Sequence, residues 1–204
     1  MRISLNAPRT TAVIIAALII VGITAGILTL PWQAMVILGS ASVVAYIGWF
    51  KTGYRYPVRS KRVIAAYLAA IAFQFIHMSE EYVGKFPHEF VTLFHTNHDW
   101  TEQTFLLTFV FGFGALWTLA AAGALYRIRL ANYFLWFYAL GAGLINAISH
   151  FAFAFIKGGY FPGLYTAAGH LIMSALVLYF LVADARDQRN NTVPVAEDLN
   201  KMSK

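Results

Sequence analysis

The stretch "VIAAYLAAIAFQFIHMSEEYV", residues 63–83, decides the class of fold that this sequence can adopt. As a helix rising about 1.5 Å per residue, it is about 30 Å long, which matches the hydrocarbon core of a bilayer. Its first part is almost wholly apolar, but its last part contains one imidazole and two carboxylates, at His77, Glu80 and Glu81. The stretch therefore predicts a membrane-spanning helix. Polar groups are costly to bury in a bilayer, so their presence in this helix needs an explanation.

The composition of the whole chain agrees with a membrane protein. Of its 204 residues 59% are hydrophobic and only 12% are charged, which is too apolar for an ordinary soluble domain. We predict an all-α, polytopic bundle of six transmembrane helices, over Thr11–Leu30, Gln33–Phe50, Val63–Val83, Gln103–Leu125, Asn132–Ile156 and Pro162–Ala183. The first is interpreted as a retained anchor, because no small-x-small cleavage site followed by polar sequence ends it.

The basic residues indicate the topology. A net charge of +6 is one mark of nucleic-acid binding, but the basic residues form no groove-like cluster with interleaved aromatics, so no nucleic-acid partner is expected. With the N-terminus inside, thirteen of the fifteen lysines and arginines fall on the inner side, and only Lys85 and Lys157 fall outside. This predicts a multi-pass protein of the cell inner (plasma) membrane with both termini in the cytoplasm.

Three regions follow from this pattern. Residues 1–61 form an N-terminal transmembrane hairpin with a basic inner loop, and residues 62–183 form a four-helix membrane domain. Residues 184–204 are polar and of mixed charge, which predicts a disordered cytoplasmic tail. The absence of cysteine excludes disulfides, thiolate catalysis and cysteine-based zinc sites, and the sequence does not indicate an oligomeric state.

The other ionisable residues gather on the outer side of this topology. Outside the tail, the acids are Glu80, Glu81, Glu89, Asp99 and Glu102, all between the third and fourth spans. All histidines also fall in the outer half, at His77, His88, His95, His98, His150 and His170. Acid-base or metal chemistry is therefore expected at the outer leaflet.

Helical geometry brings the three polar residues of the opening stretch onto one face. At about 100° per residue, Glu80 lies about 60° to one side of His77 and Glu81 about 40° to the other. A buried polar network that ties helices together would be the alternative to a functional site. Glu80 is the carboxylate more easily turned towards headgroups or water.

A second polar face occurs in the fifth span. Asn146 and His150 are four residues apart and therefore share one face of that helix. His77 and Asn146 both lie about 21 Å above the inner boundary, and Glu81 and His150 both lie about 27 Å above it. An ionisable group in a span needs a partner in the bundle interior, so we expect these faces to meet. His170 of the sixth span could join the lower level.

The outer loop allows two interpretations. His88 and the segment "HTNHD", residues 95–99, form either a second metal-like cluster or a solvated loop. Asp99 followed by Glu102 fits a capping pattern, which predicts that Asp99 begins the fourth helix.

These residues also resemble a known family. His77-Met-Ser-Glu80-Glu81 resembles the signature of the HXXEE-domain membrane proteins, and "NAISH" (146–150) and "YFPGLYTA" (160–167) are similar to that family's second and third blocks. The resemblance covers roughly residues 62–183 and implies no reaction. It implies a shared constellation of His77, Glu80, Glu81, Asn146, His150, Tyr160, Pro162, Gly163 and Thr166. Pro162 suits the first turn of the sixth helix, and Gly163 permits close approach of a backbone.

The leading hypothesis is an intramembrane enzyme that acts on a membrane lipid or other apolar small molecule. A divalent metal, zinc or iron, would be held by residues from the set His77, Glu80, Glu81, His150 and His170. With that metal, the enzyme would be a hydrolase, isomerase or oxidoreductase. The catalytic candidates are Glu80, Glu81, His77, Asn146, Tyr160 and Thr166. Without metal, they could instead perform proton transfer, as in an isomerase or hydrolase of an unsaturated lipid.

Two other classes remain. A proton- or cation-coupled transporter would use the same carboxylates, although the spans show no repeat and no charge at the midplane. A scaffold protein would use the polar residues for helix packing alone.

Overall fold

The computed structural model describes residues 7–202, and these residues form helices and connections without any strand. In chain order the helices are α1 (Pro8–Thr29), α2 (Trp32–Lys51), α3 (Lys61–Val83), α4 (Phe86–Phe94), α5 (Glu102–Phe105), η1 (Leu106–Phe113), α6 (Gly114–Leu125), α7 (Arg129–Phe137), η2 (Tyr138–Ile145), α8 (Asn146–Lys157) and α9 (Leu164–Met202). The predicted all-α class is confirmed.

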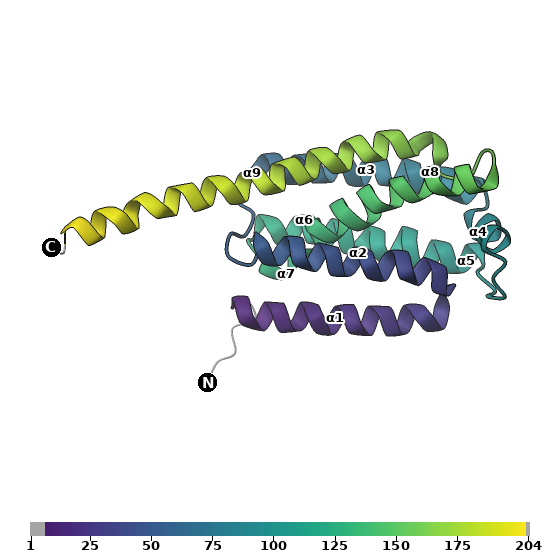
Figure 1. Ribbon diagram of the computed structural model, residues 1–204, viewed down its shortest axis with the longest axis horizontal. Coiled ribbons are helices and arrows are strands. Elements are labelled where there is room, and N and C mark those ends of the chain that lie inside the picture. Colours follow the sequence, from purple (N-terminus) through teal and green to yellow (C-terminus); the bar gives the residue numbers. More distant parts are fainter. Residues whose placement is uncertain (1–6, 203–204) are drawn as a thin grey trace.

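Six helical segments are long and apolar enough to cross a membrane, as predicted. They are Pro8–Thr29, Trp32–Lys51, Lys61–Val83, Glu102–Leu125, Arg129–Lys157 and Leu164–Asn191. Figure 1 shows that α1 begins and α9 ends at the same end of the bundle, as an even number of crossings requires. Which end faces the cytoplasm stays a prediction from the distribution of charge.

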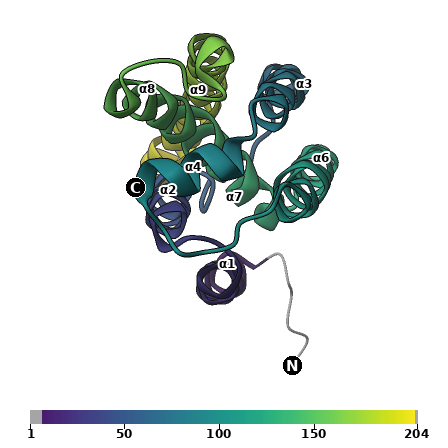
Figure 2. The same ribbon diagram turned by 90° about the vertical axis from the view of Figure 1, so that its right-hand side faces the viewer.

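The helices form a bundle with α1 at its edge and α4 across one end (Figure 2). We call this end, where the α1–α2 and α8–α9 connections also lie, the α4 end. The centre holds large buried side chains, among them Trp49, Tyr67 and Tyr138, which have almost no exposed surface. Tyr67 donates to the backbone oxygen of Trp117 (3.2 Å) and Tyr138 to that of Ala70 (2.5 Å), so both buried hydroxyls are satisfied.

Two π-helical segments, η1 and η2, interrupt the fourth and fifth spans, where the sequence had suggested continuous α-helix. Such segments change the helical register locally and are frequent at functional sites. In η2, a Cβ on Gly143 would lie 1.8 Å from Ser174 Oγ of α9. Glycine is therefore what allows η2 and α9 to pack this closely.

Two helix starts and one connection differ from expectation. Thr101, not Asp99, caps the fourth span, because its hydroxyl accepts from the backbone N–H of Thr104 (3.1 Å). Pro162 lies in the turn before α9, which begins two residues later than predicted, at Leu164. The segment expected to be a plain loop contains the helix α4.

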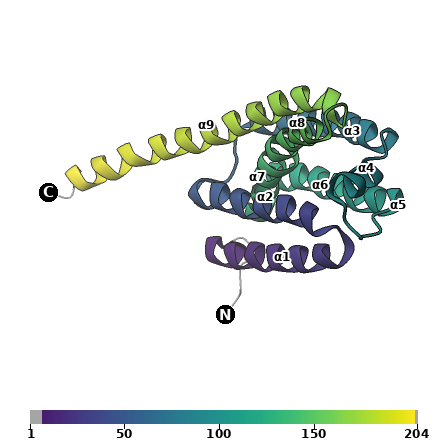
Figure 3. The ribbon, with the colours of Figure 1, turned by 45° about the vertical axis from the view of Figure 1, so that its right-hand side comes forward.

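The last span also continues further than Ala183. The carboxylate of Asp184 accepts from the backbone N–H groups of Arg59 (2.9 Å) and Ser60 (3.1 Å), and Gln188 Nε2 donates to the backbone oxygen of Pro57 (3.1 Å). The first turns of the expected tail are thus ordered against the α2–α3 connection, and α9 extends beyond the other helices (Figure 3). The division into three regions stays a prediction.

Candidate functional site

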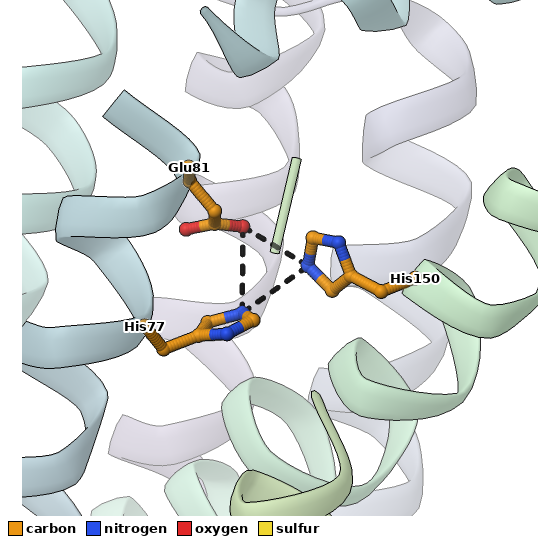
Figure 4. A group of neighbouring side chains, drawn as sticks. All are labelled: His77, Glu81 and His150. Atoms are coloured by element: carbon orange, nitrogen blue, oxygen red, sulfur yellow. Dashed lines mark hydrogen bonds and ion pairs between the residues drawn. The ribbon is translucent and has the colours of Figure 1, made fainter. Parts of the chain in front are cut away.

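Two helices bring three potential metal ligands together near the α4 end. His77 and Glu81 lie one turn apart on α3, and His150 lies on α8, all three buried (Figure 4). His150 Nε2 is 3.0 Å from Glu81 Oε1 and 3.2 Å from His77 Nε2, and His77 Nε2 is 3.6 Å from Glu81 Oε1. We call these three residues the His/Glu cluster.

The two polar faces meet at the expected depths. At the level of His77, Asn146 Nδ2 lies 2.9 Å from His77 Nε2, and at the level of Glu81 the partner is His150. The prediction that α3 and α8 pair their polar residues level by level is therefore confirmed. A polar group in a span satisfies its need for a partner in this way.

A second layer of hydrogen bonds orients His77. The hydroxyl of Thr166 donates to Glu80 Oε2 (2.6 Å), because an ionised carboxylate only accepts. Its oxygen lies 2.7 Å from His77 Nδ1 and therefore accepts the proton on that nitrogen. The lone pair of His77 is thus on Nε2, which faces the cluster, as in a histidine prepared for a metal.

Glu80 has a different role from Glu81, although both belong to one motif. Besides the Thr166 hydroxyl, its carboxylate accepts from the backbone N–H groups of Tyr165 (3.0 Å) and Thr166 (2.9 Å) and from the Tyr160 hydroxyl (3.0 Å). It therefore caps the N-terminus of α9, where the helix dipole favours a negative charge. The two carboxylates differ because about 100° of helix rotation directs Glu80 to α9 and Glu81 to α8.

Tyr160 supports Glu80 and does not reach the cluster. It lies in the connection between α8 and α9 and is 38% exposed. Partial burial, then the hydrogen bond to the Glu80 carboxylate and its charge, raise the pKa of Tyr160 to about 12. Tyr160 therefore stays protonated and donates to Glu80 at neutral pH.

Gly163 packs against the Cε1 and Nδ1 edge of the His150 ring. Its φ of +91° is one that side chains rarely adopt, and a Cβ there would lie 2.4 Å from Cε1 and 2.5 Å from Nδ1 of His150. His150 Nδ1 has no hydrogen-bond partner among the residues that the structure describes. On the Nδ1 side, packing by Gly163 therefore positions this imidazole, whereas on the Nε2 side Glu81 Oε1 lies 3.0 Å away.

His170 lies next to the cluster but contributes no ligand atom to it. Its ring stacks parallel to that of His77, with centroids 4.9 Å apart, and its Nε2 is 3.4 Å from the Tyr138 hydroxyl. Like His77 and His150, it is fully buried. His170 therefore packs against the ring of His77 and is not one of the three residues of the cluster.

Aromatic side chains close the α4 end over the cluster. Phe86 and Phe90 of α4 pack with Trp100, and Phe86 lies 5.5 Å from His150 between ring centroids. An ion pair between Lys157 and Glu89 ties α8 to α4. The segment that suggested a histidine cluster is therefore an apolar cap, which shields the buried polar groups from water.

The loop histidines stay apart from this site. His88 and His95 are exposed, and His98 is half-buried. Within residues 7–202, the group of three or more His, Cys, Asp and Glu side chains that could hold a metal is His77, Glu81 and His150. The interpretation of residues 88–99 as a second metal-like cluster finds no support in this part of the chain.

A cavity of about 80 Å³ opens beside the cluster. Glu81 and Asn146 contribute to its wall, and most of the remaining wall is aliphatic or aromatic. Gln74 and Trp117 also line it, and neither was among the predicted site residues. Gln74 had offered a signal, because it is a polar residue in an apolar run three positions before His77.

The geometry of the cluster fits a small divalent metal. Bonds of about 2.0–2.1 Å at tetrahedral angles place ligand atoms about 3.3 Å apart. The three separations of 3.0, 3.2 and 3.6 Å bracket that value. Two histidines and one carboxylate are also the ligand set of open catalytic zinc sites and of mononuclear iron sites.

Comparison with known proteins identifies the family alone. No curated protein and no solved structure matches the chain. Residues 67–178, more than half of the sequence, match the model of a family described as "Protein of unknown function with HXXEE motif", and His77, Glu80 and Glu81 are the H, E and E of that motif. The chain belongs to the HXXEE family.

Proposed function

We propose that this protein is a membrane-embedded, metal-dependent enzyme that acts on a lipid or another apolar substrate. The observation that carries the proposal is the position of the His/Glu cluster directly beside an apolar cavity, with Glu81 belonging to both. A scaffold would not require an apolar cavity at the polar groups. Clusters that combine such a cavity with converging polar residues are the usual form of a small-molecule site.

The residues of the chain would divide the work as follows. His77, Glu81 and His150 hold the ion, and a bound zinc or iron ion would supply a Lewis acid beside the cavity. Once the Nε2 lone pair of His77 is engaged, the amide of Asn146, now 2.9 Å from it, is free to donate to a substrate oxygen in the cavity. The aromatic cap excludes water and so strengthens these interactions.

The same residues also form a consistent network without metal. In that case His150 Nε2–H donates to Glu81 and Asn146 donates to His77, so proton transfer between an imidazole and a carboxylate is the chemistry available. Both alternatives use the same cavity. They differ in whether the purified protein contains a metal.

Elemental analysis of protein that has never met a chelator tests the proposal. We expect about one zinc or iron per chain in the wild type and its loss in His77→Ala and in Glu81→Ala. His95→Ala removes an exposed histidine that is not part of the cluster and should retain the metal. A wild type without metal would refute the metal-dependent enzyme and leave metal-free proton transfer or proton-coupled transport.

A further inference from the structure

A pocket lined by arginines lies at the end of the bundle opposite the α4 end, where α1 begins (Figure 1). Its volume is about 470 Å³, and its walls are Ala7, Pro8, Arg9, Tyr54, Arg55 and Arg129. The three arginines come from three separate segments, namely the first turn of α1, the α2–α3 connection and the first residue of α7. The fold therefore gathers positive charges that are far apart in the sequence around one pocket.

Packing fixes the segments that present two of these arginines. The guanidinium of Arg129 donates to the backbone oxygen of Tyr54, the residue before Arg55. The Tyr54 ring in turn packs on Trp49 and Phe50 at the end of α2, with ring centroids 5.7 and 4.8 Å apart. The start of α7 and the α2–α3 connection are thus held together at the pocket.

No carboxylate neutralises this pocket within the part of the chain that the structure describes. None lines it, and the first turns of α1 and α7 contain no acid. Arg9 and Arg55 are exposed, and neither forms an ion pair within residues 7–202. The carboxylate of Asp184 accepts instead from two backbone N–H groups of the α2–α3 connection. The pocket therefore has an excess of positive charge that a ligand can neutralise.

The pocket lies at the level where the membrane spans begin and end. Two candidate spans start at its walls, with Pro8 and Arg129, and a third ends at Lys51, three residues before Tyr54. Lipid headgroups meet a membrane protein at this level, and tyrosine is typical of the interface. The distribution of charge predicts that this end faces the cytoplasm, the side on which basic pockets between transmembrane helices bind phosphate headgroups.

We propose that this pocket binds the headgroup of an acidic phospholipid from the adjoining leaflet. Arginine is always charged, and its planar fork of N–H donors matches the oxygens of a phosphate. An acidic lipid is favoured over a zwitterionic one, because the pocket offers no negative group to the cation of a zwitterionic headgroup. Val13, one turn along α1 from Arg9 and on the same face, is 69% exposed and offers apolar surface to an acyl chain. The binding of this lipid does not depend on a metal at the His/Glu cluster.

Native mass spectrometry of the purified protein with added lipid tests the proposal. The probes are phosphatidylglycerol and phosphatidylcholine with identical acyl chains, each added to delipidated protein in a neutral detergent. In the wild type we expect an apparent dissociation constant at least tenfold lower for phosphatidylglycerol. Arg9→Gln and Arg55→Gln should each reduce this preference about fivefold, since each removes one positive charge from the pocket. Arg129 stays unchanged, because its side chain also holds the Tyr54 backbone.

Arg62→Gln is the matched control, because it removes an exposed arginine of the same end that does not line the pocket. It should keep the full preference, and a loss as large as in Arg55→Gln would assign the effect to diffuse surface charge and overturn the proposal. Equal binding of both lipids by the wild type, or a preference that Arg9→Gln and Arg55→Gln both retain, would also overturn it. Displacement of phosphatidylglycerol by an equal concentration of inorganic phosphate would identify a soluble anion as the ligand and refute the lipid assignment.

Discussion

Replacing Gly163 by alanine should damage the cluster although Gly163 supplies no ligand. The added Cβ would lie 2.4 Å from His150 Cε1, so the imidazole or the turn must move by about 1 Å to reach ordinary van der Waals contact. Metal sites tolerate displacements of only about 0.2 Å. We expect the affinity for zinc to fall about 100-fold, equivalent to about 2.8 kcal/mol.

Stability should fall as well, for two separable reasons. The φ of +91° at Gly163 costs a side chain about 1–2 kcal/mol, and the overpacking against His150 costs about 1–3 kcal/mol more. Gly158→Ala carries the first cost alone, because Gly158 has a φ of +75° and nothing within 4 Å of the added Cβ. Gly159→Ala carries neither cost.

The assay is competition for zinc against a chromophoric chelator, together with thermal unfolding of the metal-free proteins. Gly158→Ala and Gly159→Ala should bind zinc like the wild type, and only Gly163→Ala should lose affinity. If Gly163→Ala binds zinc as tightly as Gly158→Ala, the contact of Gly163 with the imidazole does not position a metal ligand, and the reasoning fails.

Three further predictions concern the surroundings of the cluster. Thr166→Val removes the acceptor of the His77 Nδ1 proton and should weaken zinc binding about 10–100-fold in the same competition assay, whereas Thr166→Ser should remain within a few-fold of the wild type; equal affinities would exclude this orienting role. Asp184→Asn weakens two hydrogen bonds from backbone N–H groups of the α2–α3 connection and should lower the unfolding temperature by a few degrees. The metal content should not change, and a loss of metal would show that this contact influences the His/Glu cluster. Tyr160 should ionise near pH 12, measured as the tyrosinate absorbance of wild type minus Tyr160→Phe. Because its pKa in the folded protein lies above the unfolded value, the hydrogen bond to Glu80 stabilises the fold below about pH 10 and is lost as the pH rises through about 12, and a midpoint near 10 would refute this contact.

The arrangement of the spans could be predicted from the sequence because hydrophobic length is a local property. The six apolar stretches agree with the helices to within three residues, apart from the end of the last one. The pairing of His77 with Asn146 and of Glu81 with His150 was also predictable, since helical rise alone sets the depth of each residue. The π-helical segments were not, because they arise from packing between helices.

The sequence by itself determined that this chain forms an apolar helical bundle with histidines and carboxylates near one end. Only the tertiary structure decided that Glu81 joins the cluster while Glu80 caps α9, and that His170 stacks on His77 instead of completing a ligand set. It also decided that the histidine-rich connection serves as an aromatic cap. The physical reason is that spacing along a helix fixes direction and depth, whereas the partner found there depends on which neighbouring helix lies in that direction.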